Sequence, residues 1–341
     1  MAKTVVAVEI TEESVRAAEV TTGRSPMLIA AGEVPLPPGA AKDSEVLDRE
    51  AVALALSQLW SESGISGRDV TLGVGSRRVL VREHSTPLRN HTQIRQALPF
   101  QVQDLLPVPV DQAVLDFCPI SDDGTQVHGL LVAAVAETIE ELIATLAQAK
   151  LHVNTVDLGA FGFVRALGLI APPGSTALLI NIGEHTTQLV IAIDGVPQFV
   201  RVMSVDIMPE RDESAGFEAM PPVETESRRS RRRDRTVEAV AIPDEAPLTP
   251  EQQAALVDLA GRLRSTLSFY LAREDSLPID VAWVSGAGSR YERMRDVLDR
   301  IVGVEVRPLS ATDVTRAKNP IEPALGARLL GAAALTLGGT R

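Results

Sequence analysis

The feature that most constrains this chain is a strand–turn–strand pattern that occurs twice. In the first copy, Val5–Ile10 and Val15–Val20 flank a polar turn. In the second copy, Ala177–Ile182 and Thr187–Ile193 flank a turn that contains Gly183. Runs of this length and composition predict β-hairpins. A repeated unit of this kind predicts a fold built from two similar halves.

Helices are expected between the strands, which makes the predicted fold class α/β. Apolar residues recur at helical spacing in Asp48–Ser63 and Thr92–Leu105. Further helices are predicted over Glu137–Ala149, Phe161–Ile170, Thr249–Leu271, Tyr291–Ile301 and the segment from Pro323, which is apolar almost all round. Further strands are predicted over Met27–Val34, Val70–Val74, Val79–His84, Val114–Ile120, Val127–Ala136, Val153–Asp157, Pro197–Val202, Val281–Val284 and Val304–Val306.

Composition excludes several classes of protein. The chain has 341 residues, 45% of them hydrophobic, which is enough for a sizeable core. A formal net charge of −12 argues against nucleic acid as a partner. The single Cys118 excludes an intramolecular disulfide, and the histidines lack metal-ligand spacing, so no metal site is predicted. With no signal peptide and no bilayer-spanning run, a cytoplasmic location is expected.

Residues 209–247 differ in composition from the rest of the chain. They combine many acids, the arginine-rich run Arg228–Arg235 and several prolines with few apolar residues. This composition predicts a disordered, charged linker. The arginine run has the charge to contact anionic lipid or RNA, but the acids on both sides favour a solvated, partly self-neutralised loop.

Three turns that follow strands carry residues suited to holding phosphate, because backbone amides and glycine let an anion approach the main chain. The candidate binding residues are Thr11, Ser14, Arg16, Gly183, Thr186, Thr187, Gly286, Ala287 and Gly288. Taken singly, each turn is equally typical of turn geometry, and Gly286 and Gly288 would also suit close packing at a strand end. No nucleophile elbow, Walker loop or dinucleotide fingerprint occurs, so no catalytic residue is predicted.

The order of these turns resembles that of the actin/Hsp70 ATPase superfamily and, within it, the PilM family of type IV pilus assembly, which is related to FtsA. The most specific segment is Ala97–Phe117, where Leu106–Asp111 and Val114–Phe117 resemble the family's "IPFPLDEV-LDY" stretch. Other similar pieces are Pro35–Gly39, Gly64–Gly67, Val153–Leu167 and Ser268–Leu271. The resemblance covers nearly the whole chain except the linker. It implies a two-lobed, actin-like (ribonuclease H-like) ATPase fold with an inserted FtsA/PilM-type subdomain.

The first two turns depart from the family's pattern. The family's first turn is similar to "DIGSSSVK", but Glu9 replaces its aspartate, Thr11 its glycine, and Glu12 and Glu13 two serines. In the second turn, Asn181 replaces the acid of "DIG-T-T". A carboxylate about 4 Å from a phosphate charge costs on the order of 4 kcal/mol at an effective dielectric of about 20, or about a thousandfold in affinity. The ATP and magnesium site that the resemblance implies is therefore predicted to be weak or lost.

The substituted positions also have interpretations that involve no ligand. Glu12 and Glu13 would also suit a solvated hairpin tip, and Asn181 would suit the capping of a turn. The third turn, Gly286–Arg290, is similar to the family's "GGGAR" and is expected to be intact.

The resemblance divides the chain into parts. Residues 1–76 and 155–170 are expected to form the first actin-like lobe, 77–154 the inserted subdomain, 171–208 and 280–341 the second lobe, 209–247 the linker, and 248–279 a reduced helical subdomain.

The resemblance also implies a function. The chain is expected to be a cytoplasmic scaffold of the type IV pilus inner-membrane platform, held at the membrane only through its partners. Those partners would be the N-terminal segment of a PilN-like membrane protein, bound between the first lobe and the inserted subdomain, and other platform proteins. An active ATPase or kinase on the same fold is the alternative that phosphate release would support. An FtsA-like division protein or a type II secretion protein is disfavoured, because neither a terminal amphipathic helix nor a transmembrane helix is evident.

Overall fold

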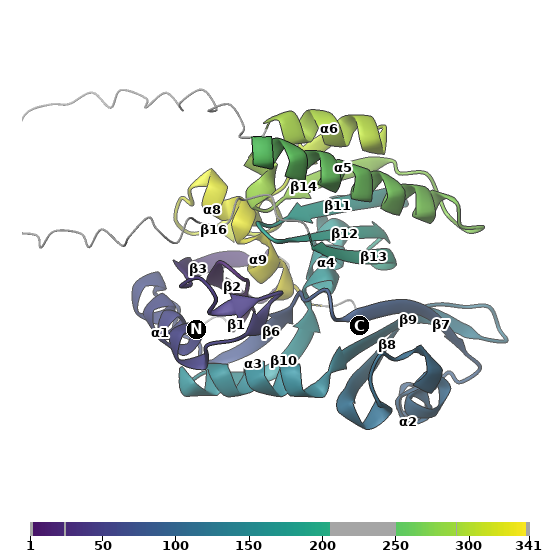
Figure 1. Cartoon of the computed structure of the whole chain (residues 1–341), viewed down its shortest axis with the longest axis horizontal. Helices are drawn as coiled ribbons and strands as arrows, with labels where there is room; N and C mark the ends of the chain where they lie inside the picture. Colours follow the sequence, from purple (N-terminus) through teal and green to yellow (C-terminus); the bar gives the residue numbers. More distant parts are fainter. Residues whose placement is uncertain (1–2, 24, 205–249, 291, 339–341) are drawn as a thin grey trace, which may run out of the picture.

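The structure is a computed structural model that describes residues 3–23, 25–204, 250–290 and 292–338, so the predicted linker 209–247 lies outside the described residues. Two mixed β-sheets form two lobes (Figure 1). A three-stranded sheet extends sideways from the first lobe, and a two-stranded hairpin, β4 (Ala41–Lys42) and β5 (Glu45–Val46), lies beside it.

The first sheet contains the first predicted hairpin. Its strands are β1 (Thr4–Ile10), β2 (Ser14–Thr21), β3 (Met27–Pro35), β6 (Asp69–Val74), β10 (His152–Leu158) and β16 (Arg316–Ala317), in the order β10, β6, β1, β2, β3, β16. β1 is antiparallel to β2 and parallel to β6, which is parallel to β10. The turn of the hairpin therefore lies at the carboxyl edge of the parallel strands, where α/β sheets commonly place their sites.

The second sheet repeats this arrangement. Its strands are β11 (Thr176–Ile182), β12 (Thr186–Ile193), β13 (Val196–Ser204), β14 (Val281–Ser285) and β15 (Val306–Pro308), in the order β13, β12, β11, β14, β15. β11 is antiparallel to β12 and parallel to β14. Helices α5 (Pro250–Leu271) and α6 (Glu292–Val302) cover its outer face, where Leu259, Leu263 and Leu298 are buried against Ile180.

Four helices enclose the first sheet. α1 (Arg49–Ser63) and α3 (Ala136–Gln148) pack on one face, whereas α4 (Gly159–Ile170) and α9 (Leu330–Leu335) lie between the two lobes (Figure 1). The stop predicted for α1 is confirmed: Gly64 has φ of 73°, a left-handed conformation that glycine adopts without strain. Among the described residues, no helix is both long and apolar enough to cross a bilayer.

The inserted part consists of β7 (Leu80–Thr86), β8 (Ala113–Asp122) and β9 (Val127–Val135), in the order β7, β9, β8, with α2 (His91–Gln101) packed on β8. Leu98, Phe117 and Leu131 form its small core. The helix predicted over Thr92–Leu105 ends at Gln101, because Val102 leaves the helical region with φ of −113°. Short 3₁₀ turns follow over Gln103–Leu105 and Val110–Gln112.

The C-terminal segment differs from the single helix predicted from Pro323. It forms two short helices, α8 (Pro323–Arg328) and α9, on either side of Leu329, after α7 (Ala311–Val314). The break leaves the Ala332 amide to hydrogen-bond to the Glu9 carboxyl. In addition, β16 pairs with β3 of the first sheet, although the sequence division assigned 280–341 to the second lobe. The domain division as a whole remains a proposal.

Candidate functional site

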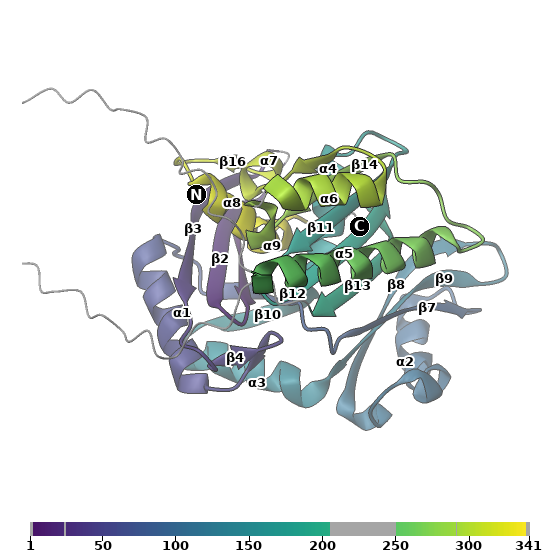
Figure 2. The ribbon, with the colours of Figure 1, turned by 45° about the horizontal axis from the view of Figure 1, so that its top comes forward.

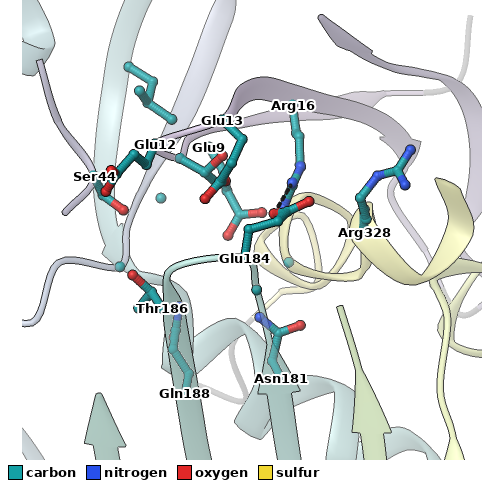
Figure 3. A pocket seen from close by; sticks show the side chains of 16 residues that line it. Glu9, Glu12, Glu13, Arg16, Ser44, Asn181, Glu184, Thr186, Gln188 and Arg328 are labelled. Atoms are coloured by element: carbon teal, nitrogen blue, oxygen red, sulfur yellow. Dashed lines mark hydrogen bonds and ion pairs between the residues drawn. The ribbon is translucent and has the colours of Figure 1, made fainter. Parts of the chain in front are cut away.

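Two hairpin turns meet between the lobes (Figure 3). The β1–β2 turn brings Glu12 and Glu13 from the first lobe, and the β11–β12 turn brings Glu184 from the second. The Thr11 hydroxyl donates to the Ser14 carbonyl at 3.0 Å and accepts from the Ser14 amide at 3.1 Å. In the other turn, the Gly183 amide donates to the Thr186 carbonyl at 2.9 Å. These groups hold the turns in shape, so their hydrogen bonds are already used locally.

The cavity between the turns is small and acidic. Its volume is about 50 Å³, whereas pockets for drug-sized ligands span roughly 300–1,000 Å³. The charged residues that line it are Glu9, Glu12, Glu13, Glu184, Arg16 and Arg328. Acidic side chains outnumber basic ones in this lining. Glu12 is one of them, so the tip of the β1–β2 hairpin faces the cavity and is not only a solvent-exposed turn. The arrangement is unfavourable for a large anion.

A network of ion pairs occupies the space beside this cavity and joins the two lobes. Arg16 Nε contacts Glu33 Oε1 at 2.7 Å, and Arg16 Nη2 contacts Glu184 Oε2 at 3.4 Å. The other oxygen of Glu33 accepts from Arg328 Nε at 2.7 Å. Glu184 therefore brings a carboxylate of the second lobe to a buried cation of the first, which is the contact that an anionic ligand between the lobes would otherwise make.

The charges in this network hold one another ionised. Burial alone would raise the pKa of Glu33, but Arg16, Ser14 and Arg328 together hold that pKa below its usual value. Burial would lower the pKa of Arg16, yet Glu33 and Glu184 keep it above its usual value. The guanidinium and the carboxylate are therefore a matched pair, and each depends on the other to remain charged in the interior.

Two further glutamates, Glu9 and Glu13, have pKa values that are raised, in contrast to that of Glu33. Burial raises the pKa of Glu9 to about 7, despite the charge of Arg16 and the Ala332 amide. Burial and the neighbouring Glu184 raise the pKa of Glu13 to about 7. Glu13 Oε1 also lies 3.6 Å from His185 Nε2 across the lobes. Both acids consequently change charge near neutral pH.

Replacing Glu9 with glutamine is expected to stabilise the protein above pH 7 by about 1 to 3 kcal/mol, since one pKa unit corresponds to about 1.4 kcal/mol. The folded state raises the Glu9 pKa from 4.5 to about 7. It therefore holds the proton more tightly than the unfolded chain, and wild-type stability falls as pH rises through this range. The neutral amide avoids that loss, so the difference should vanish below about pH 4.5. Urea unfolding of both proteins between about pH 4 and about pH 8 measures it. A constant difference at every pH would show that Glu9 is not the titrating group.

The structure places the sequence-predicted residues in three groups. Thr11, Arg16, Gly183 and Thr186 line the cavity. Ser14 and Thr187 are buried beside it, and within the described residues the Thr187 hydroxyl has no hydrogen-bond partner. The third group, Gly286–Gly288, lies against the end of β11: Gly286 has φ of +83°, and a Cβ at either glycine would collide with Ile182. These glycines permit close packing of the strand end.

Sequence reasoning missed Glu33, Glu184 and Arg328. Glu184 lies inside a turn that the pattern did identify, and its negative charge beside a candidate anion site was the available signal. Glu33 lies within strand β3, and Arg328 is in the apolar C-terminal segment. Neither has a local motif, so only the tertiary fold reveals their pairing.

A second candidate site is an apolar groove of about 420 Å³ between the first lobe and the inserted sheet. Its lining includes Val114 and Leu115 of β8, Val156 and Leu158 of β10, and Phe161 of α4. Among the described strands, β8 and β10 are edge strands of their sheets. An extended peptide can add to such an edge through main-chain hydrogen bonds and place alternate side chains in apolar pockets.

Charged pairs accompany this groove. Arg95 Nη2 contacts Asp116 Oδ1 at 3.2 Å, and Arg165 Nη2 contacts Asp157 Oδ2 at 2.6 Å. Asp116 and Asp157 line the groove with Arg95. Polar groups around an apolar centre are the usual anatomy of a protein–protein interface.

Comparison with known proteins identifies relatives of the whole fold. The model of the family "Type IV pilus assembly protein PilM" matches residues 7–204. A solved PilM–PilN type IV pilus biogenesis complex contains a chain that is 21% identical, with coverage of 98% of this chain and 97% of that one and a TM-score of 0.76. The ethanolamine utilization protein EutJ from Carboxydothermus hydrogenoformans is 14% identical, with coverage of 98% and 90% and a TM-score of 0.52. The predicted fold class, a two-lobed actin-like α/β fold, is confirmed.

Proposed function

The chain belongs to the PilM family of type IV pilus assembly proteins, and from this membership we propose that it is a cytoplasmic scaffold of the pilus inner-membrane platform. Its partner is the N-terminal segment of a PilN-like membrane protein, which holds it at the membrane, and other platform proteins assemble on it. The similarity to a chain solved in a PilM–PilN complex supports this partner.

The observation that carries the proposal is the groove between the edge strands β8 and β10. It provides two free strand edges, an apolar floor and an acidic and basic rim, which together suit an extended segment of mixed composition. Val114 and Val156 are 50% and 39% exposed, so apolar surface is available there without unfolding. A peptide that buries these valines gains the hydrophobic contribution that the free protein lacks.

Nucleotide binding is weak or lost in this proposal. The cavity between the turns is about 50 Å³, and Glu184 already satisfies Arg16 across the lobes. A triphosphate would have to displace that carboxylate and lie among Glu9, Glu12 and Glu13. The residues present therefore do not fit ATP, and closure of the lobes relies on the chain's own ion pairs.

Isothermal calorimetry with a synthetic N-terminal peptide of the PilN-like protein tests the scaffold role. The peptide is expected to bind with the same affinity with and without Mg-ATP, while Mg-ATP alone gives no saturable heat. Absence of peptide binding under both conditions would refute the scaffold. Micromolar binding of Mg-ATP that weakens on Thr187→Ala would refute the loss of nucleotide binding. Phosphate release above background would favour the ATPase alternative.

A further inference from the structure

A second groove lies between the inserted sheet and the second lobe. Its volume is about 640 Å³. One wall is β7, represented by Leu80–Arg82, and the other is β13, represented by Val200–Val202. Pro107, Val108 and Val135 also line the groove. Figures 1 and 2 both show β13 next to the inserted sheet.

The lining shows that the groove runs along strand edges. Successive residues of a strand point to opposite faces of the sheet. A cavity lined by three successive residues of β7 and three of β13 therefore contacts the edges of these strands, not one face. Among the described strands, β7 pairs only with β9 and β13 only with β12. Each wall thus offers backbone groups that no neighbouring strand occupies, which suits the addition of an extended chain.

The charge of this groove is positive, although the protein carries a net charge of −12. The described residues that line it include no acid and four arginines: Arg77, Arg78, Arg82 and Arg201. Arg77 pairs with Asp43 at 3.0 Å and Arg78 with Glu45 at 2.8 Å. Arg82 and Arg201 have no ion pair with any residue that the structure describes, and both are exposed. Two cations, one on each wall, are therefore available to a ligand.

We propose that this groove is a docking site for an extended protein segment that alternates acidic with apolar residues. Such a segment adds as a strand to the edge of β7 or β13. Its carboxylates pair with Arg82 and Arg201, and its apolar side chains pack on Val81, Val200 and Val202. The partner is a protein other than the PilN-like one, because arginines line this groove, whereas the groove between β8 and β10 is apolar with Asp116 and Asp157 in its lining. The inserted sheet thus presents two grooves of different chemistry to two partners.

Docking in this groove would connect the inserted sheet to the second lobe. One wall belongs to the inserted sheet and the other to the second lobe, so the bound segment bridges parts that are distant in sequence. Glu83 of β7 already pairs with Arg273 beyond the end of α5. A strand bound in the groove would reinforce this link and fix the inserted sheet against the second lobe.

A fluorescent peptide that alternates valine with glutamate serves as the probe, with fluorescence anisotropy as the measurement. The full chain is expected to bind it saturably, and the double variant Arg82→Glu/Arg201→Glu is expected to weaken binding at least about tenfold through loss of two charge-assisted contacts. N-methylation of alternate peptide amides on the hydrogen-bonding side is also expected to abolish binding, because strand addition needs those donors. A peptide with lysine in place of glutamate should not bind.

The matched control is Arg264→Glu/Arg300→Glu, which makes the same charge change at exposed arginines of α5 and α6. This control should bind the probe as the wild type does. The Arg82/Arg201 variant should still bind the PilN-like peptide, which shows that the variant is folded. Because that peptide binds in the other groove, its binding also distinguishes a failure of this proposal from a failure of the scaffold proposal. Equal loss in both double variants, equal binding of the lysine peptide, or no binding of the glutamate peptide would overturn the proposal. Saturable binding of a labelled single-stranded RNA, without any binding of the glutamate peptide, would likewise overturn the proposal.

Discussion

Replacing Val114 and Val156 together with aspartate is expected to weaken binding of the PilN-like peptide by at least about a hundredfold, or about 2.7 kcal/mol. The two valines lie on β8 and β10, on facing walls of the groove. Covering one such side chain contributes about 1.5 to 3 kcal/mol. With aspartate at these positions the complex loses this contribution, and burying the carboxylates under the peptide also costs desolvation free energy. Anisotropy of the labelled peptide measures the change.

The same substitution at Val257 provides the control. Val257 lies on α5, is 69% exposed and does not line the groove. Val257→Asp should leave peptide affinity unchanged, and all variants should keep the thermal midpoint of the wild type, because these exposed side chains contribute little to the core. An unchanged affinity in the Val114/Val156 variant, or an equal loss in the Val257 variant, would place the peptide elsewhere.

Local sequence signals were sufficient for most of the fold. The hairpins around Thr11 and Gly183 follow from apolar runs interrupted by turn residues. The end of α1 follows from the glycine at position 64, because glycine readily adopts the left-handed conformation found there. The C-terminal segment was harder to predict. Its residues are apolar on all sides, so periodicity could not distinguish one helix from two. The partner of the Ala332 amide, Glu9, is distant in sequence and carries no local signal of the break.

The candidate sites required the tertiary structure. The sequence showed that Glu9, Glu12 and Glu13 replace phosphate-binding residues, but not which cations would face them. Glu33 and Arg328 are 295 residues apart in the chain and meet only because α8 lies against the first sheet. Grooves between sheet edges are equally invisible, because edge positions depend on strand order and not on the composition of any one strand.

Glu33 is the central acceptor of the interlobe network. Its Oε1 accepts from Arg16 Nε at 2.7 Å and from Ser14 Oγ at 2.8 Å, and its Oε2 accepts from Arg328 at 2.7 Å. The side chains of Arg16 and Glu33 are only 7% and 13% exposed. Removing the charge of Glu33 would leave Arg16 with the longer contact to Glu184 alone. A buried cation with too little compensation is far more costly than a lost surface pair.

Glu33→Gln is therefore expected to lower the free energy of unfolding by about 3 to 5 kcal/mol at pH 7, the range for breaking a buried pair by removing one partner. Glu141→Gln is the matched control, because Glu141 likewise pairs with arginine, accepting two hydrogen bonds from Arg49, but its side chain is 35% exposed. Its loss should be much smaller. Guanidinium unfolding of both variants and the wild type measures the difference. Similar losses in the two variants would show that the interlobe network is no more important than a surface pair.

The pH dependence of this effect tests its electrostatic origin. The folded state lowers the Glu33 pKa from 4.5, so the folded carboxyl releases its proton more readily than the unfolded one. The stabilisation is then fully present above about pH 4.5 and is lost as pH falls through the lowered folded value. The gap between wild type and Glu33→Gln should therefore be constant from neutral pH down to about 5 and close in more acidic solution. A gap that persists below that range would mean that the variant disturbs packing, since a neutral Glu33 and a glutamine make nearly the same contacts. Closure of the gap would instead show that the lobes are joined by charge, at the place where the two hairpin turns meet.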